Sequence, residues 1–169
     1  MTLFKRSKLP DEGRPELVDT ERIMAWAPVV EGAFLVATNA GLWVTQGQRL
    51  GWHEISKATW SGEVLTVIPG PVTLHDEVGV VVEEPRMSWL LETPGKLPRQ
   101  VQERVTRSVA YSSHHLLPGQ PGGVRVLARR VPGLDGLLWG VRYDEGVDPT
   151  DPAVAALTTE LVTRAQQEM

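Results

Sequence analysis

Short runs of apolar residues, many of them alternating with polar ones, make up most of the chain as far as Thr93. Side chains of a strand point alternately to its two faces, so a period of two indicates strands. In residues 64–69 (VLTVIP) both faces carry apolar side chains, which predicts a central strand. The same reasoning predicts strands at residues 22–30, 33–38, 41–46, 49–60, 78–84 and 87–93. About seven or eight short strands at close spacing are typical of a small antiparallel barrel or sandwich.

Turn residues separate these strands. Asn39 and Gly41 tolerate positive φ, and the apolar runs on both sides of them give the clearest hairpin signal in the chain. In the segment RLGWHEISKATW the alternation changes phase at Ile55, which predicts a bend or bulge near Ser56.

The pattern changes after Pro94-Gly95. Apolar residues then recur at every fourth position, which predicts an amphipathic helix from Pro98 to about Leu116. Residues 124–131 and 137–143 are predicted to pair as a second hairpin, because Pro and Gly residues lie between them. Asp151-Pro152 is expected to begin a final helix, since Asp caps free N–H groups and Pro fits the first helical position.

These elements divide the chain into three parts. Residues 1–20 are charged and have little to bury, which indicates a flexible N-terminal arm. Residues 21–117 form the β-rich domain with its closing helix, and residues 118–169 form a hairpin and helix appended to it. The arm carries Leu3 and Phe4 beside three cations, a composition that allows only marginal contact with an anionic membrane.

Composition narrows the function classes. The 169 residues include 41% hydrophobic and 22% charged residues, which is typical of a globular protein. The net charge of −4 argues against a nucleic-acid partner, whose phosphates are normally bound by a surplus of Lys and Arg. The chain has no Cys, so disulfides, thiolate nucleophiles and Cys-based metal sites are excluded. No apolar segment reaches the roughly 20 residues of a membrane span, and we expect a cytoplasmic protein without a cofactor.

The order of these segments resembles the bacterial pleckstrin-homology-like domains over about residues 21–116. The segments that carry the resemblance are FLVATNAGLWV, LGWHEISKATWSGEVLTVIP, MSWLLET and the helix LPRQVQERVTRSV. The Thr38-Asn39 turn and the element from Trp52 to Ile55 follow the order of that family. The resemblance implies a bent barrel of about seven antiparallel strands closed by a helix, and a module without catalytic activity. It names no ligand, because one fold hosts many functions.

Two adjacent histidines, His114 and His115, are the first candidates for catalysis or metal binding. On the predicted helix they project about 100° apart, so they cannot chelate a metal together as an i, i+4 pair would. Ser112 and Ser113 could supply a nucleophile, yet no carboxylate nearby in the sequence would orient an imidazole. We therefore predict no catalytic residue and no metal site, and assign these histidines to a polar helix end.

Trp and Arg dominate interaction hot spots, and the chain has six Trp. The predicted binding patch combines residues of the first domain and of the second hairpin: Trp60, Arg129, Arg130, Trp139 and Arg142. We accordingly expect a protein-interaction or scaffolding module with a protein partner. An alternative is a carrier of a small apolar ligand or lipid in the barrel mouth, which would require a pocket of roughly 300 Å³ or more lined by Trp and Val. An unpaired edge of the second hairpin could also join a second copy into a homodimer.

Overall fold

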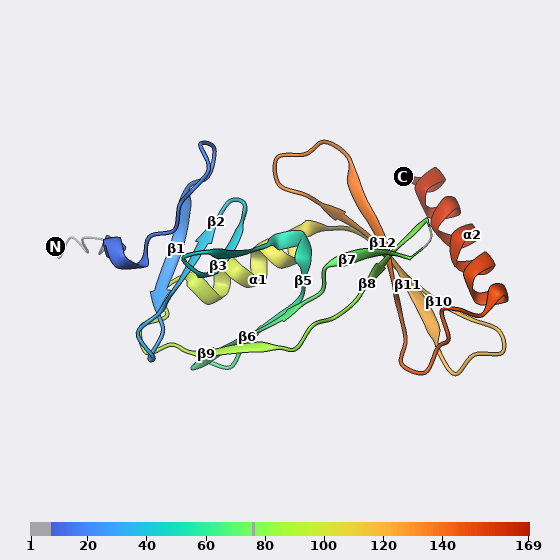
Figure 1. Cartoon of the computed structure of the whole chain (residues 1–169), viewed down its shortest axis with the longest axis horizontal. Coiled ribbons are helices and arrows are strands. Elements are labelled where there is room, and N and C mark those ends of the chain that lie inside the picture. Colours follow the sequence, from blue (N-terminus) through green and yellow to red (C-terminus); the bar gives the residue numbers. More distant parts are fainter. Residues whose placement is uncertain (1–7, 76) are drawn as a thin grey trace.

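The computed structural model describes residues 8–75 and 77–169 (Figure 1). In this part of the chain, three separate sheets are accompanied by two α-helices. Two hydrophobic cores lie side by side along the long axis of the molecule. The first is built from the strands up to β6 (Val64–Pro69), from β9 (Met87–Leu90) and from α1 (Leu97–Ser108), and the second lies under the C-terminal helix. The predicted α+β, strand-rich class is therefore confirmed.

A four-stranded antiparallel meander begins the fold. Its strands are β1 (Ile23–Pro28), β2 (Phe34–Thr38), β3 (Gly41–Thr45) and β4 (Gln48–Gly51), and they pair in sequence order. The predicted hairpin at Asn39 joins β2 to β3, with Val36 opposite Trp43. Leu35, Ala37 and Leu42 are fully buried, so one face of this sheet covers the first core.

A three-stranded antiparallel sheet covers the same core from another side. A short 3-10 helix, η2 (Trp52–Glu54), leads into β5 (Ile55–Trp60), which pairs with β6 (Val64–Pro69) and through it with β9 (Met87–Leu90). The central position of β6 is as predicted, and Leu65 and Val67 are its buried side chains. The register shifts between Ile55 and Lys57, where the phase change in the sequence predicted a bulge.

The sheets do not close into the predicted barrel. Among the described residues, β4 and β5 are not paired, and the two sheets remain separate hydrogen-bonded units. The chain leaves the second sheet after β6, builds two strands elsewhere and returns only at β9. The prediction of a single bent barrel was therefore wrong as to closure, although seven strands and one helix do surround the first core.

Helix α1 (Leu97–Ser108) packs against β5, β1 and β2, and its apolar stripe of Leu97, Val101 and Val105 is buried, as predicted. The predicted extension to Leu116 was wrong. The helix ends at Ser108, whose hydroxyl donates to Val105 O (2.6 Å), and the next eight residues form strand β10 (Val109–Leu116). Serines that bond the preceding turn and β-branched or aromatic residues beyond it favour an extended chain there.

A five-stranded sheet forms the other half of the molecule, in the order β10-β11-β12-β8-β7. The predicted hairpin is present as β11 (Gly123–Arg130) and β12 (Leu137–Tyr143). Strands β7 (Val72–His75) and β8 (Val78–Val81) come from the segment between β6 and β9, and β8 joins β12 in parallel. Residues inside the predicted first domain thus complete the sheet of the C-terminal hairpin. Both strands of that hairpin are interior to the sheet, so the prediction that the hairpin has an unpaired edge was wrong.

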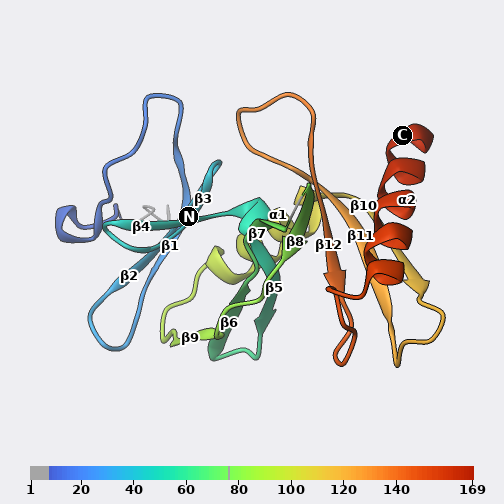
Figure 2. The same ribbon diagram turned by 45° about the vertical axis from the view of Figure 1, so that its right-hand side comes forward.

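Helix α2 (Pro152–Glu168) covers one face of this sheet, as Figure 2 shows. Asp151 caps it by accepting a hydrogen bond from Ala153 N (2.9 Å), as the sequence predicts. Side chains of α2 meet the buried strand residues of β11 and β12 in the second core. This core consists of the buried residues Leu117, Val124, Val126, Val141, Val154, Leu161 and Ala165, with partly buried neighbours.

Residues 8–20 differ from the flexible arm that the sequence suggests. Leu9 is only 7% exposed, and a short 3-10 helix, η1 (Asp11–Gly13), follows it. Gly13 lies against the ring of Phe34, and Gln46 donates a side-chain hydrogen bond to Glu12 O. The apolar and basic residues proposed for membrane contact lie outside the described residues, apart from Lys8, which is exposed.

Candidate interaction surface

The five residues of the predicted binding patch do not form one surface. Trp60, at the end of β5, packs partly buried against the first core. Trp139 packs against the second core, with its ring centroid 5.7 Å from that of Tyr111. Arg130 is exposed and donates to Arg107 O (2.8 Å) at the end of α1. Both tryptophans therefore support the cores.

The remaining arginines of the patch lie on the face of the five-stranded sheet opposite α2. Val124 and Val126 face the second core, so the intervening residues of β11 point to the other side. In the β11–β12 register, Arg125 is directly opposite Arg142, and Arg129 is opposite Leu138. We call the surface formed by Arg125, Leu127 and Arg129 of β11 with Leu138 and Arg142 of β12 the arginine face.

Two arginines of this face are partly exposed and face each other across the strands. Arg142 Nη1 lies 3.3 Å from Glu83 Oε1, and both side chains of this ion pair are well exposed. Arg125 Nη1 donates to the hydroxyl of Ser112 (2.9 Å), a neutral partner. The positive charge of the pair is thus only partly balanced. Glu83 and Ser112 are distant from these arginines along the chain, so no local pattern predicts these contacts.

Arg129 is buried at the junction of the two cores, where it donates to Ser108 Oγ (2.7 Å) and to Trp52 O (3.5 Å). Burial, and then the charge of Arg142, lowers the pKa of the Arg129 guanidinium. Its role is to tie β11 to the end of α1 and to η2. Arg129 is therefore not available to a partner in the way that the predicted patch requires.

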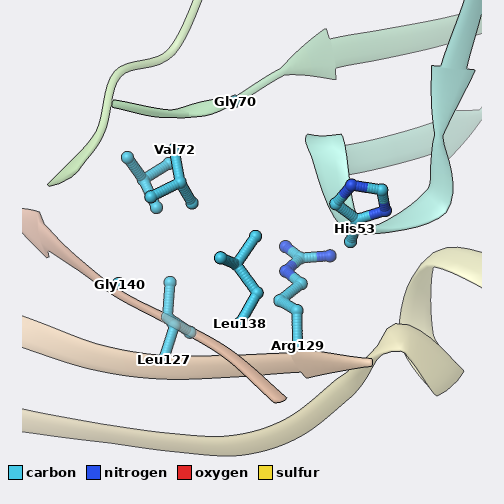
Figure 3. A pocket seen from close by; sticks show the side chains of 8 residues that line it. His53, Gly70, Val72, Leu127, Arg129, Leu138 and Gly140 are labelled. Atoms are coloured by element: carbon cyan, nitrogen blue, oxygen red, sulfur yellow. The ribbon is translucent and has the colours of Figure 1, made fainter. Parts of the chain in front are cut away.

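His53 faces Arg129 across a small cavity, as Figure 3 shows. Desolvation lowers the pKa of His53, and the charges of Arg129 and Arg49 act in the same direction while Glu54 opposes them. The imidazole is therefore neutral at neutral pH, and its Nδ1 has no hydrogen-bond partner among the described residues. The cavity measures about 10 Å³, space for no more than one water.

A larger hollow of about 460 Å³ lies at the outer end of the first sheet. It is lined by Glu12, Gly13, Gly32, Ala33, Phe34, Thr45, Gln46 and Gly47. Its lining mixes polar and apolar groups, includes three glycines and has no Trp or Val, whereas the apolar junction cavity is far too small for a ligand. Neither hollow supplies the combination of volume and apolar lining that the lipid-carrier alternative requires.

The adjacent histidines lie on β10 and face opposite sides of the sheet. His114 Nε2 lies 2.8 Å from Asp144 Oδ2, and this carboxylate also accepts from Gly123 N (2.7 Å). The bond from Gly123, and then that from His114, lowers the pKa of Asp144. His115 Nε2 instead bonds Ser113 Oγ (2.9 Å). The carboxylate and the serine thus contact different histidines, and a Ser-His-Asp triad is not assembled.

We find no candidate metal-binding cluster among the described residues. Within residues 8–75 and 77–169, no group of three or more His, Asp or Glu side chains is placed to hold an ion.

Asp144, the carboxylate that contacts His114, lies 30 residues further along the sequence, so the pattern of residues around His114 could not identify it.

Glu21 is the most deeply buried carboxylate of the first sheet. It accepts hydrogen bonds from Thr38 Oγ1 (2.6 Å), Trp43 Nε1 (2.9 Å) and Arg49 Nη1 (2.9 Å). Desolvation raises its pKa, but these hydrogen bonds and one from Val18 N more than offset the effect, and the pKa of Glu21 is lowered. Every donor belongs to the framework of the sheet, so we assign this cluster to stability.

Comparisons of the chain with protein-family models, curated proteins and solved structures found no match. Neither α1 nor α2, the α-helices of the described chain, is long and apolar enough to cross a membrane. We therefore infer function from the geometry of the arginine face.

Proposed function

We propose that the chain is a non-catalytic protein-interaction module of pleckstrin-homology-like type, which binds an acidic segment of a partner protein through the arginine face. The observation that carries this proposal is the register of Arg125 and Arg142, two partly exposed cations directly opposite one another. Like charges in opposite positions destabilise a sheet. A carboxylate placed between the two guanidinium groups would remove this repulsion and gain charge-assisted hydrogen bonds.

The nearby carboxylates, Glu83 and Asp144, do not prevent a partner's carboxylate from binding Arg125 and Arg142. Glu83 pairs with Arg142 at 3.3 Å in an exposed position, and exposed ion pairs contribute little to stability. A carboxylate of the partner can therefore replace Glu83 at low cost. The Asp144 carboxylate is hydrogen-bonded to Gly123 and His114 and makes no direct ion pair with either arginine among the described residues, although the charge of Arg125 contributes to its lowered pKa. Arg is suited to this task because its planar fork binds a carboxylate through two parallel hydrogen bonds.

The order of elements in the first half supports the pleckstrin-homology-like part of the proposal. Seven of the nine strands before α1 form these two sheets, four in one and three in the other, and α1 packs against both; β7 and β8, inserted between β6 and β9, belong to the five-stranded sheet. The separation of Ser113 and Asp144 onto different histidines supports a role without catalysis. Both points are consistent with a binding module and identify no partner.

The test compares point variants, because truncation would break the structure. Strand β8 pairs with β12 and β10 pairs with β11, so removal of the C-terminal hairpin would leave unpaired strands in the rest of the chain. Wild-type protein, the double variant Arg125→Ser/Arg142→Ser and the control Arg99→Ser/Arg164→Ser are each used to capture partners from cell extract. The control removes the same charge from exposed i, i+4 ion pairs on α1 and α2.

We expect the wild type and the control to retain the same proteins, and the arginine-face variant to lose them. With a purified partner, the variant should raise the Kd at least ~10-fold, because two charge-assisted hydrogen bonds of roughly 1.5 kcal/mol or more are removed. Rising salt should weaken wild-type binding and leave the variant nearly unaffected. Equal capture by all three proteins would refute the proposal.

A further inference from the structure

The five-stranded sheet ends at β10, an edge strand of eight residues without Lys, Arg, Asp, Glu or Pro. Natural proteins usually protect such an edge with charges, prolines, bulges or a covering element. Here a register shift affects only the first residues of the strand, α2 packs on β11 and β12, and Leu116 is 79% exposed. Within residues 8–75 and 77–169, no strand is paired with the outer edge of β10.

One backbone hydrogen bond fixes the direction of the amides along β10. Leu117 N donates to Gly122 O (3.3 Å), continuing the β10–β11 ladder. Bonded and non-bonded positions alternate in an antiparallel pair, so the odd-numbered residues of β10 bond to β11. The backbone N–H and C=O groups of Ser112, His114 and Leu116 therefore point away from the sheet, toward an added strand.

We propose that the outer edge of β10 pairs antiparallel with β10 of a second copy of this chain, joining two five-stranded sheets into one continuous sheet about a two-fold axis. The charge distribution favours this occupant. Exposed Arg107 and Arg130 lie at the start of β10, where Arg130 Nη1 contacts Val109 O (3.2 Å). Near its other end the Asp144 carboxylate contacts His114, in the same region as Arg125, which is opposite His114 in the register. Antiparallel pairing brings Arg107 and Arg130 of each copy toward the end of the counterpart strand that carries Asp144.

The side chains of β10 are also compatible with their own antiparallel partner. A register centred on Ser113 of both copies places Ser112 opposite His114 of the second copy, and Tyr111 opposite His115. No two histidines are then opposed, and the strand has no Lys, Arg, Asp or Glu to place against its counterpart. The interface is isologous, because each contact occurs twice about the axis. Since it involves little more than one strand from each copy, we expect a weak dimer. This inference does not depend on the arginine-face proposal.

Single cysteines test the geometry directly, because the chain has none of its own. In the expected register, Ser113 and its counterpart form a non-hydrogen-bonded pair with Cα atoms about 4.5 Å apart, within the range of a disulfide. Ser113→Cys should form a disulfide-linked dimer under mild oxidation much faster than Gln166→Cys, an exposed control on α2. Faster linkage of Ser112→Cys instead would also support edge pairing, with the register centred one residue earlier.

Light scattering tests the association without any cross-link. We expect wild-type mass to rise from monomer toward dimer between low micromolar and several hundred micromolar concentration. The variant Ser112→Lys/Leu116→Lys should raise the dimer Kd at least ~10-fold, because edge lysines oppose strand addition. The control Leu134→Lys/Thr163→Lys adds the same charge at exposed positions outside β10 and should dimerise like the wild type. Thermal unfolding checks that each variant is folded.

A wild type that stays monomeric at every concentration, with no selective cross-linking on β10, would overturn the inference. Equal dimerisation of the two lysine variants would do so as well, because it would locate the interface elsewhere. Loss of partner capture by the arginine-face variant is a separate result, measured on a different assay.

Discussion

Replacing Glu21 with Gln should destabilise the protein far more than any exposed carboxylate replacement. The side chain of Glu21 is completely buried, and its carboxylate joins Thr38, Trp43 and Arg49 from three different strands. Gln has nearly the same shape but carries no charge, and its amide group replaces one of the two acceptor oxygens with a donor. At least one of the three donors would then face a donor inside the sheet.

The expected loss is about 2–4 kcal/mol of the free energy of unfolding. Hydrogen bonds to a charged group contribute roughly 1.5–3 kcal/mol each, and breaking a buried ion pair by removing one partner costs about 3–5 kcal/mol. The Arg49 side chain is 33% exposed and can regain water, so the upper part of that range does not apply. For a chain of this length the change corresponds to a fall of roughly 4–16 °C in Tm.

Urea unfolding followed by tryptophan fluorescence measures this change, with Glu16→Gln as the matched control. Glu16 is exposed, and its replacement should change the free energy of unfolding by less than about 0.5 kcal/mol. The m-values of both variants should equal that of the wild type, since the area exposed on unfolding does not change. Equal stabilities of Glu21→Gln and Glu16→Gln would refute the argument that the cluster stabilises the sheet.

The same carboxylate should also govern acid unfolding. The folded pKa of Glu21 is lowered below its ordinary value of 4.5, so the unfolded chain binds its proton more readily. Its stabilisation is then fully present above about pH 4.5 and is lost as pH falls through the lower, folded pKa. Glu21→Gln should therefore show a shallower loss of stability below pH 4.5 than the wild type. Parallel acid profiles for the two proteins would contradict this assignment.

Two further predictions concern the junction and the C-terminal helix. Burial lowers the folded pKa of His53 below 6.5, so wild-type stability should fall as pH drops below about 6.5, where the unfolded chain takes up the proton first. The variant His53→Gln should reduce this dependence of stability on pH, whereas His75→Gln, at an exposed position, should not. An unchanged pH dependence in His53→Gln would contradict the prediction. Asp151→Ala should remove the cap of α2 and cost about 1 kcal/mol in urea unfolding. Asp135→Ala, at an exposed position in the β11–β12 loop, is its control, and equal losses would argue against the cap.

The sequence pattern predicted helices and strands correctly where residues close together in the sequence determine the structure. The apolar side chains on both faces of residues 64–69 predicted a central strand, and the phase change at Ile55 predicted the bulge that the register shows. Asp151 with the following proline predicted the start of α2. Each of these signals depends on neighbours a few residues apart, which is the range that sequence periodicity covers.

The errors arose where distant contacts decide the structure. Val109 continues the four-residue period of α1, so the predicted helix ran past the observed end at Ser108. Pairing with β11 instead makes Val109 the first residue of a strand. Nothing near residues 78–81 indicates that they pair with β12, where Val80 is opposite Val141, 61 residues further along. The acid that contacts His114 and the serine that contacts Arg125 also come from other strands. Long-range pairing of this kind leaves no periodic trace in the sequence.

The position of β7 and β8 has a consequence for synthesis of the protein in the cell. These strands leave the ribosome before the hairpin β11–β12 exists, yet their place in the sheet depends on β12. During translation, the valine-rich segment around Val80 is therefore without its native neighbour until the last quarter of the chain emerges. Such a delay slows folding, and it leaves an unpaired, apolar strand exposed to binding by chaperones or by other nascent chains.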